Sequence, residues 1–373
     1  GLTRESIENK FPNMSRGRIV KVLNEEIKKV KKNCWKVYPK KKKSVKLYVK
    51  RIFIMDDCED IVPEWLKFMR GIVDSNDIQL NVSRELLQQS HIVKQMGKII
   101  VKRSIELFNQ LAEDKEKYEI FYDTYNKMLK LGVHEDKRNR DKLAKLLRFY
   151  SVNHRDNYIS LDDYINNMNE GQNNIYFITG QSINSLSSSP FIEQLKEDGN
   201  DILYFIDPID EYMIQNLKQY EKYNLIDVSK EEIEFDEKQG KDNKDLLDYI
   251  KKTLEGKVND VKISKRLMDT PCVLVTTNQG WSANMERIVK AQALRNNEMD
   301  HFMVSKKILE INLCNNVISK IAGKVEIGDT DEESDKIVSM LYNTAQINCG
   351  FILEDPSEFA KKINGMIEES FCY

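Results

Sequence analysis

The sequence predicts an α/β segment that combines long helices with a small parallel-type α/β unit, followed by an α+β C-terminal domain. Three observations predict this order. Apolar residues recur at three- and four-residue steps over long stretches, which is typical of helices. Two short apolar runs, 175–179 and 202–206, are rich in β-branched and aromatic residues, as buried parallel strands are. Roughly the last forty residues have the pattern of a helical hairpin.

The first part of the chain is an unassigned basic segment, 1–45, followed by a predicted strand–helix–strand unit. The lysine run Lys40–Lys43 has two interpretations, an import or nucleic-acid patch and a solvated loop before a strand. We favour the loop because no aromatic residue is interleaved with the lysines. Lys46–Met55 and Gly71–Ser75 are predicted strands. Between them Glu59–Arg70 is a predicted short helix with a proline in its first turn.

A long helix is predicted next, from about Arg84 to Leu111, because apolar side chains repeat along one face. Shorter helices are expected at Glu116–Leu131 and Arg138–Arg148. An alternating α/β stretch follows. Its predicted elements are a strand at Ile175–Thr179, a helix at Phe191–Glu197, a strand at Ile202–Ile206, a helix from Asp207 and a strand at Leu225–Val228.

A charged stretch, 229–245, contains few apolar side chains and is the predicted linker between domains. We therefore expect a middle segment at 46–228 and a C-terminal domain at 246–373. The middle segment divides further into a strand and long-helix unit, 46–150, and an α/β unit, 151–228.

The C-terminal domain is predicted to contain two strands, Val258–Ile263 and Val273–Thr276, and otherwise helices. Gly350 suits the end of the first hairpin helix, and Asp355 begins a capping-box-like start of the second. The apolar positions of the hairpin fall on single faces, with Ile337, Leu341, Tyr342 and Ala345 in the first helix and Phe359, Ile363 and Met366 in the second. Two short helices cannot bury such faces alone, so we expect them to pair with a second copy as a four-helix bundle.

The composition is that of an ordinary folded protein with little net charge. Among 373 residues, 58 are Lys or Arg and 60 are Asp or Glu, which gives a formal net charge of −2. This balance predicts neither a nucleic-acid partner nor a membrane-surface partner. The longest apolar runs are too short to cross a bilayer. The N-terminus shows no apolar stretch typical of a secretory signal.

The cysteines and histidines predict neither a metal site nor a disulfide framework. Six cysteines are scattered without a C-x-x-C pair, and four histidines lack metal-ligand spacing. A reducing compartment, the cytoplasm, is therefore expected. Cys272 in a predicted strand is better interpreted as a buried, inert thiol than as a nucleophile. No phosphate-binding glycine loop or nucleophile elbow occurs, so the sequence shows no self-contained active site.

Several sequence blocks carry a more specific signal. They are Lys46-Leu-Tyr-Val-Lys-Arg-Ile-Phe-Ile, Gly71-Ile-Val-Asp-Ser, Asn81-Val-Ser-Arg-Glu-Leu-Leu-Gln-Gln, Lys130-Leu-Gly-Val-His-Glu-Asp, Leu143-Ala-Lys-Leu-Leu-Arg-Phe, Asp207-Pro-Ile-Asp-Glu-Tyr, Gly280-Trp-Ser-Ala-Asn-Met-Glu-Arg-Ile and Lys290-Ala-Gln-Ala-Leu-Arg. In order and spacing, from about residue 44 to the end, they resemble the heat shock protein 90 family of chaperones, and its cytosolic branch most. We expect residues 1–43 to lie outside this resemblance.

The resemblance also shows departures. From the resemblance we expect no counterpart here of the family's ATP-binding domain, of the first part of its middle domain or of the acidic tail that recruits tetratricopeptide co-chaperones. Where the family has an Asn-Pro pair, this sequence has Asn312-Leu-Cys, so a different local turn is expected.

For the middle segment, the resemblance implies that Arg84 reaches the γ-phosphate of a nucleotide held by the missing domain, with Gln88 in support. A planar, permanently charged guanidinium suits that task. Without the resemblance, Arg84 would be interpreted as an exposed arginine offset by Glu85. We expect no cofactor and no metal in this chain alone, whereas the full-length family uses ATP and Mg.

For the C-terminal domain, the resemblance implies that Trp281 and Met285 belong to a projecting amphipathic element that holds client proteins. A stripe of Met and aromatic residues is more often part of a core. Adaptable methionines are, however, also typical of promiscuous binding surfaces. The resemblance further implies that the hairpin faces named above form the family's dimer interface.

The sequence thus predicts a chaperone segment that binds and remodels client proteins as a homodimer, with co-chaperones as further partners and without nucleic acid or membrane. Its middle part would complete the ATPase site of an absent N-terminal domain. An alternative is a truncated paralogue that dimerises with full-length partners and lowers their activity. A free-standing ATPase is disfavoured because no cradle for a triphosphate is encoded.

Overall fold

The computed structural model describes residues 18–22, 45–55, 62–75, 91–230, 243–278, 280–293, 307–353 and 355–371. By its internal contacts the chain divides into two compact units, Gly1–Leu146 and Leu147–Tyr373. None of the helices in the described ranges is both long and apolar enough to cross a membrane.

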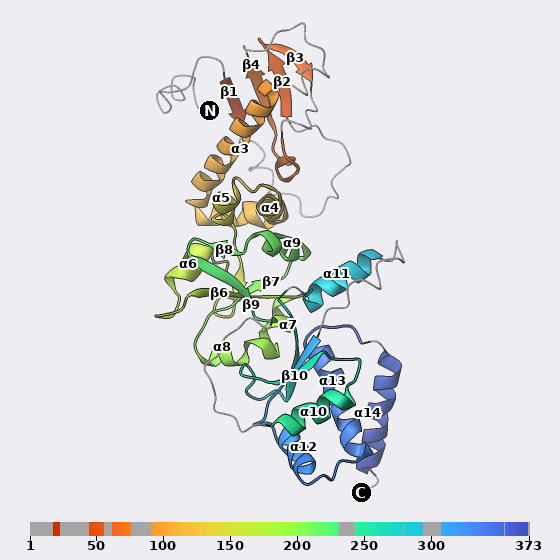
Figure 1. Cartoon of the computed structure of the whole chain (residues 1–373). Coiled ribbons are helices and arrows are strands. Elements are labelled where there is room, and N and C mark those ends of the chain that lie inside the picture. Colours follow the sequence, from red (N-terminus) through yellow and green to blue (C-terminus); the bar gives the residue numbers. More distant parts are fainter. Residues whose placement is uncertain are drawn as a thin grey trace. The chain divides into compact units, whose positions relative to one another are not determined.

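The first unit contains a four-stranded sheet (Figure 1) in the order β1-β4-β2-β3. Its strands are β1 (Arg18–Val22), β2 (Val45–Val49), β3 (Ile52–Met55) and β4 (Gly71–Ser75). β4 lies antiparallel to β1 and parallel to β2, and β3 is antiparallel to β2. Alternate residues of β2, Val45, Leu47 and Val49, are buried, so one face of this strand meets the core.

Two predictions for this unit are wrong. The single strand expected at Lys46–Met55 is a hairpin, turned by Lys50 and Arg51 at φ 48° and 68°. Such a two-residue turn usually contains Gly, Asn or Asp. Lys50 and Arg51 are none of these, so the local sequence does not indicate that the strand ends there. Of the helix expected at Glu59–Arg70, the described residues contain only the short 3-10 helix η2 (Glu64–Leu66).

The helices of the first unit are α3 (His91–Ala112), α4 (Lys115–Glu135) and α5 (Arg140–Ala144). All three were predicted, although α5 ends before the expected Arg148. Asp114 caps α4 by accepting a hydrogen bond from the backbone N–H of Lys117 at 3.2 Å. Gly132 lets the Trp65 indole lie against α4, because a Cβ at this position would come within 2.8 Å of the ring. Helix packing here therefore requires a glycine that lowers helix propensity.

The second unit begins with a five-stranded sheet in the order β5-β7-β6-β9-β8. Its strands are β5 (Tyr150–Ser151), β6 (Asn174–Thr179), β7 (Leu203–Phe205), β8 (Gln219–Tyr220) and β9 (Tyr223–Asp227). β6 is parallel to both β7 and β9, which confirms the predicted parallel α/β unit.

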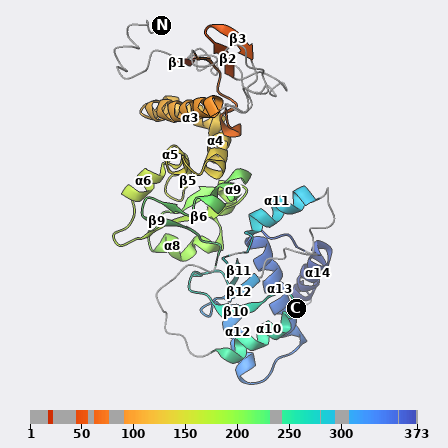
Figure 2. The ribbon, with the colours of Figure 1, turned by 45° about the horizontal axis from the view of Figure 1, so that its top comes forward.

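Helices flank this sheet on both faces. They are α6 (Leu161–Asn166), α7 (Ile183–Ser187), η3 (Pro190–Ile192), α8 (Glu193–Glu197) and α9 (Pro208–Asn216). Figures 1 and 2 show α8 on the opposite side of the sheet from α6 and α9. α9 begins where the sequence predicted a helix, and Asp207 and Pro208 start it with a capping box and a proline in the first turn.

A three-stranded sheet follows, in the order β10-β12-β11. Its strands are β10 (Asp260–Ile263), β11 (Cys272–Thr276) and β12 (Lys307–Ile311). The helices around it are α10 (Lys244–Thr253), α11 (Ala283–Ala293), α12 (Asn316–Glu326), α13 (Glu332–Asn348) and α14 (Pro356–Phe371). Cys272 is buried, and burial raises the pKa of its thiol to about 12, which fits the predicted inert role.

The central strand β12 corrects the sequence analysis, which expected only helix in this part of the domain. All five of its residues are buried, including Lys307 and Glu310. Charged residues in a buried strand require buried partners, and these come from distant parts of the sequence. The local sequence pattern therefore did not indicate a strand here.

Glu310 forms a two-pronged ion pair with the buried Arg266, with Nε to Oε2 at 2.9 Å and Nη2 to Oε1 at 3.0 Å. The same guanidinium donates to the carbonyl of Val228 at 2.6 Å and to that of Lys230 at 3.0 Å. Arg266 thus joins the end of the five-stranded sheet to the central strand of the next sheet. Ser264 Oγ donates to Glu310 as well, at 3.0 Å.

Other contacts join the two sheets of the second unit. The Glu193 carboxylate of α8 accepts hydrogen bonds from the backbone N–H groups of Met268 at 2.8 Å and Asp269 at 3.2 Å. One hydrophobic core includes Val228 before the charged segment 229–245 and Leu246 after it. Most of that segment lies outside the described residues, and its role as a linker remains a prediction.

The turn at Asn312-Leu-Cys, where the sequence departs from the family pattern, is built by Asn312 itself. Its side-chain amide donates to the carbonyls of Met268 at 2.8 Å and Thr270 at 3.2 Å. Its Oδ1 accepts from the backbone N–H of Cys314 at 3.0 Å. The asparagine therefore fixes a turn without a proline.

Candidate protein-interaction surfaces

The described residues contain no group of three or more His, Cys, Asp or Glu side chains arranged to hold a metal ion. Ser151, His154 and Asp201 do come together, but Ser151 Oγ at 3.2 Å and Asp201 Oδ2 at 3.6 Å both approach the same ring atom, His154 Nδ1. A nucleophile relay needs the two different nitrogens of the imidazole. The cluster therefore stabilises a turn.

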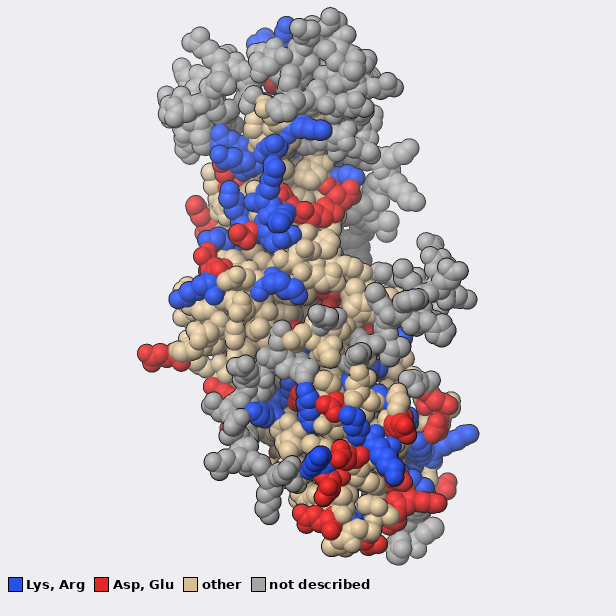
Figure 3. All heavy atoms as spheres, viewed as in Figure 1, with Lys and Arg blue, Asp and Glu red and all other residues tan. Residues whose placement is uncertain are grey.

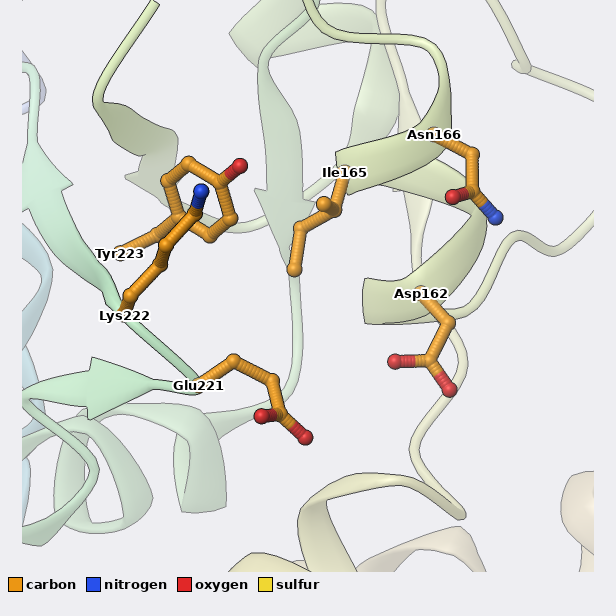
Figure 4. A pocket seen from close by; sticks show the side chains of 6 residues that line it. All are labelled: Asp162, Ile165, Asn166, Glu221, Lys222 and Tyr223. Atoms are coloured by element: carbon orange, nitrogen blue, oxygen red, sulfur yellow. The ribbon is translucent and has the colours of Figure 1, made fainter.

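A pocket lies between α6 and the turn that joins β8 to β9 (Figure 4). It is lined by Asp162, Ile165, Asn166, Glu221, Lys222 and Tyr223. Asp162 accepts a hydrogen bond of 2.5 Å from the Tyr220 hydroxyl, and Lys222 Nζ lies 5.2 Å from the centroid of the Tyr223 ring. These side chains are already engaged in local contacts, so the pocket gives no reason to assign a ligand.

The residues expected to contact a nucleotide, Arg84 and Gln88, lie outside the described residues. The described part of α3 begins at His91. Their role remains a prediction.

Trp281 and Met285 are brought together at the base of α11, the expected client-holding element. Trp281 is half-buried immediately before the helix, whereas Met285 lies in its first turn and is only 8% exposed. An incoming protein could therefore reach Trp281 and the half-buried residues further along α11, but not Met285 without movement.

A buried carboxylate holds one side of this base. Glu211 of α9 accepts hydrogen bonds on Oε1 from Ser282 Oγ at 2.7 Å and from Asn284 Nδ2 at 3.0 Å. Ser282 Oγ also caps α11 by accepting from the Met285 backbone N–H at 3.0 Å. Burial raises the pKa of the Glu211 carboxyl, and the hydrogen bonds from Ser282, Thr179 and Asn284 partly offset this effect.

The other side of the base faces the C-terminal helices. Glu286 of α11 pairs with Lys290 at 2.9 Å, and Lys307 Nζ of β12 lies 3.9 Å from the second oxygen of Glu286. Lys307 Nζ also lies 4.4 Å from the centroid of the Phe351 ring, which follows α13. Figures 1 and 2 show α11 projecting outward at the level of the five-stranded sheet, with α13 below it. The base of α11 is thus held from two directions.

Sequence reasoning missed Glu211, Ser282, Asn284 and Lys307. The first three lie in sequence blocks that carried the family resemblance, but nothing local indicated that the blocks meet. The burial of Glu211, which requires hydrogen-bond donors from elsewhere in the chain, is visible only in the structure.

The C-terminal hairpin forms as predicted, with Gly350 at φ 80° after α13 and Asp355 Oδ1 accepting from the backbone N–H groups of Ser357 and Glu358, each at 2.9 Å. The predicted interface residues of α13 pack within the chain itself. Ala345 is 1% exposed, and Ile337 and Leu341 are half-buried against the core that includes β11. Ala345 therefore has almost no surface left for a partner, whereas Ile337 and Leu341 keep part of theirs.

In α14 the predicted interface residues differ in exposure. Phe359 and Ile363 are half-buried, and Met366 is 52% exposed. Ile367 beside Met366, together with Ile347 and Ile352 around the hairpin turn, is exposed as well. The uncovered apolar surface of the hairpin thus lies mainly on α14 and at the turn.

Comparison with known proteins decides the family. The family model described as Hsp90 protein matches residues 27–372. This chain belongs to the Hsp90 family. The resemblance stated from the sequence blocks is confirmed. The expectation that residues 1–43 lie outside the family is wrong for 27–43.

Relatives in this family include Heat shock protein 83 of Leishmania donovani, which is 44% identical over 338 residues, 88% of this chain and 75% of that protein. Heat shock protein 90-5, chloroplastic, of Arabidopsis thaliana is 41% identical, with 88% of this chain and 43% of that protein covered. An endoplasmin homolog of Hordeum vulgare is 39% identical, and the match covers 89% of this chain and 44% of that protein. The chain spans less than half the length of the last two. Because Hsp90 relatives include a chloroplastic protein, cytoplasmic localisation remains a prediction.

Proposed function

We propose that this Hsp90 chain holds non-native client proteins at the surface around Trp281 and α11 and acts as a homodimer joined through α14. The observation that carries the proposal is the base of α11. There a half-buried tryptophan stands beside a helix that Glu211 and Lys307 hold in place. A rigid aromatic anchor loses little conformational freedom on binding, which favours affinity.

Partner classes follow from the same surfaces. On the face shown in Figure 3, acidic and basic side chains are intermingled over the C-terminal helices of the second unit. Such a mixture does not create the single-sign field that favours nucleic acid or an anionic membrane. We propose client proteins, a second copy of the chain and co-chaperones as partners, and the cytoplasm as the compartment.

The client surface predicts a measurable effect of Trp281→Ala. The probe is fluorescein-labelled α-lactalbumin, kept unfolded by reduction and carboxymethylation, and the measurement is fluorescence anisotropy. Loss of an aromatic anchor should weaken binding by about 1.4 kcal/mol, or roughly tenfold. The matched control is Ile327→Ala, which removes a side chain that is 75% exposed at the end of α12 and should change affinity less than about twofold. Equal affinity of the wild type and Trp281→Ala would refute the assignment.

A second part of the proposal concerns the middle segment and rests on family membership alone. Arg84 and Gln88 would complete the ATPase site when a nucleotide-binding domain precedes them, and that domain would hold ATP and Mg. We propose no cofactor for this chain alone. In this arrangement Arg84 stabilises charge that develops on the transferred phosphoryl group.

In a protein that joins such a domain to this chain, Arg84→Ala is expected to lower kcat for ATP hydrolysis about a hundredfold and to leave nucleotide affinity nearly unchanged. Steady-state phosphate release and nucleotide titration measure the two quantities. Arg138→Ala, an exposed arginine of the same unit, serves as the control and should leave both unchanged. An unchanged kcat in Arg84→Ala would show that this arginine has no role in ATP hydrolysis.

A further inference from the structure

Three cations lie at the base of α11, and two of them share one carboxylate. Lys290 and Lys307 approach the two oxygens of Glu286 at 2.9 Å and 3.9 Å. Arg287 differs from both. Within the part of the chain that the structure describes, no carboxylate lies within 4.0 Å of its guanidinium, and its hydrogen bond goes to Asn284 Oδ1 at 2.6 Å. A guanidinium has five N–H donors, so most of its binding capacity remains available.

Asn284 fixes the position of Arg287. Its Nδ2 donates to the buried Glu211 carboxylate at 3.0 Å while its Oδ1 accepts from Arg287 Nη2 at 2.6 Å. The two contacts leave a single orientation for the amide, since a flipped amide would face a donor with a donor and an acceptor with an acceptor. The chain from Glu211 through Asn284 therefore orients Arg287 before any partner arrives, which lowers the entropy lost on binding.

The surroundings of Arg287 indicate what kind of group it would bind. Arg287 is half-buried as a residue, and the residues that follow it on α11, Ile288 and Val289, are half-buried and apolar. Counting Glu211 and Glu286 against Arg287, Lys290 and Lys307, the base of α11 has an excess of one positive charge. A partner that complements this surface carries a carboxylate next to apolar side chains, because a carboxylate accepts two parallel hydrogen bonds from a guanidinium.

We propose that Arg287 selects among client segments, binding the carboxylate of an Asp or Glu that lies beside apolar residues. The proposal rests on the proposed client surface at α11 and names the chemistry of its preferred client. Trp281 contributes sequence-independent apolar contact, and Arg287 contributes the preference for acidic residues. Lys290 adds little to this preference because Glu286 already neutralises it.

The test uses the full chain and three fluorescein-labelled peptides of identical apolar sequence that differ only at a central residue, Glu, Gln or Lys. Anisotropy titrations give the three dissociation constants at low salt. For the wild type, the Glu peptide should bind about five- to tenfold more tightly than the Gln peptide, and the Lys peptide more weakly than both. Added salt should reduce the difference.

Three variants locate the preference. Arg287→Ala should bind Glu and Gln peptides equally, with the affinity for the Gln peptide within about twofold of wild type. Arg287→Lys should retain part of the preference, because it keeps the charge without the paired donors. Lys290→Ala, an exposed cation on the same helix, should retain it fully. Far-UV circular dichroism and thermal unfolding verify that each variant folds.

The possible results separate the two proposals. If no peptide binds the wild type, the client surface at α11 is refuted. If all three peptides bind equally, the client surface stands and the role of Arg287 is refuted. If Arg287→Ala weakens all three peptides by the same factor, Arg287 supports the structure of the site and the selection is refuted as well.

Discussion

Replacement of Arg266 by methionine is expected to lower the free energy of unfolding of the second unit by about 3–5 kcal/mol. Arg266 is 2% exposed and forms the two-pronged pair with Glu310. Methionine fills similar space but leaves the Glu310 carboxylate buried without its cation. It also removes the donors that satisfy the carbonyls of Val228 and Lys230. Each buried group left without a partner costs free energy.

Native-state hydrogen exchange followed by mass spectrometry measures this effect, because it reports the opening of β12 separately from the first unit. The control is Lys251→Met, which removes an ion pair with Asp260 of similar length, 2.9 Å, between two exposed side chains. That change should cost less than about 1 kcal/mol. The expectation fails if Arg266→Met destabilises the protein no more than Lys251→Met does.

A double variant, Arg266→Met with Glu310→Leu, tests the cause. Removing both charges eliminates the unpaired carboxylate, and apolar replacements of buried ion pairs are often neutral. The carbonyls of Val228 and Lys230 still lack their donors, so we expect partial recovery. Recovery to full stability would show that the carbonyl contacts contribute little.

Replacement of Met366 by glutamate is expected to convert a dimer to monomers and to raise the dissociation constant at least about a thousandfold. Met366 is 52% exposed in the single chain, so the substitution should not disturb the folding of the monomer. In a symmetric dimer joined through α14 it would place two carboxylates in an apolar interface, and each costs several kcal/mol. Sedimentation equilibrium at about 20–50 µM measures the effect, since interfaces of standard size commonly reach sub-micromolar affinity.

The choice of residue matters for this experiment. Leu341 belongs to the predicted interface as well, but it packs half-buried against the core of its own chain. A glutamate there would destabilise the folded monomer, so a loss of dimer could not be distinguished from a loss of folding. Ile327→Glu, at the most exposed of the large apolar side chains in the described residues, is the matched control and should leave the dimer intact. A wild-type chain that stays monomeric at these concentrations would refute dimerisation through α14.

The sequence predicted those elements whose signal is local. The helices around Tyr118, Tyr342 and Met366 follow from apolar residues at helical spacing, and the parallel strands β6, β7 and β9 follow from short β-branched and aromatic runs. Caps such as Asp114 and Asp355 mark where helices begin because their side chains bind the first N–H groups.

Features that depend on distant partners could not be predicted in this way. Glu310 is compatible with a buried strand only because Arg266 lies beside it. Arg266 is distant in the sequence, so the residues of β12 alone do not indicate this partner. The faces of α13 and α14 have similar apolar patterns, but β11 covers α13 and leaves Met366 of α14 exposed. The base of α11 depends on Glu211, which is remote in the sequence. Periodicity shows that a face is apolar, not what covers it.

The place of α11 between β11 and β12 has a consequence for redesign. The two strands pair antiparallel along their whole length, and about thirty residues, including α11, connect Thr276 to Lys307. The pairing of β11 with β12 involves no residue of this connection. The sheet therefore places a weak constraint on the length of this insert, whereas Glu211 and Lys307 place a strong one on its base. Experiments that graft a new recognition sequence into this insert should therefore replace residues beyond Lys290 and retain 280–290. The graft would then be attached to a helix base that is held in place.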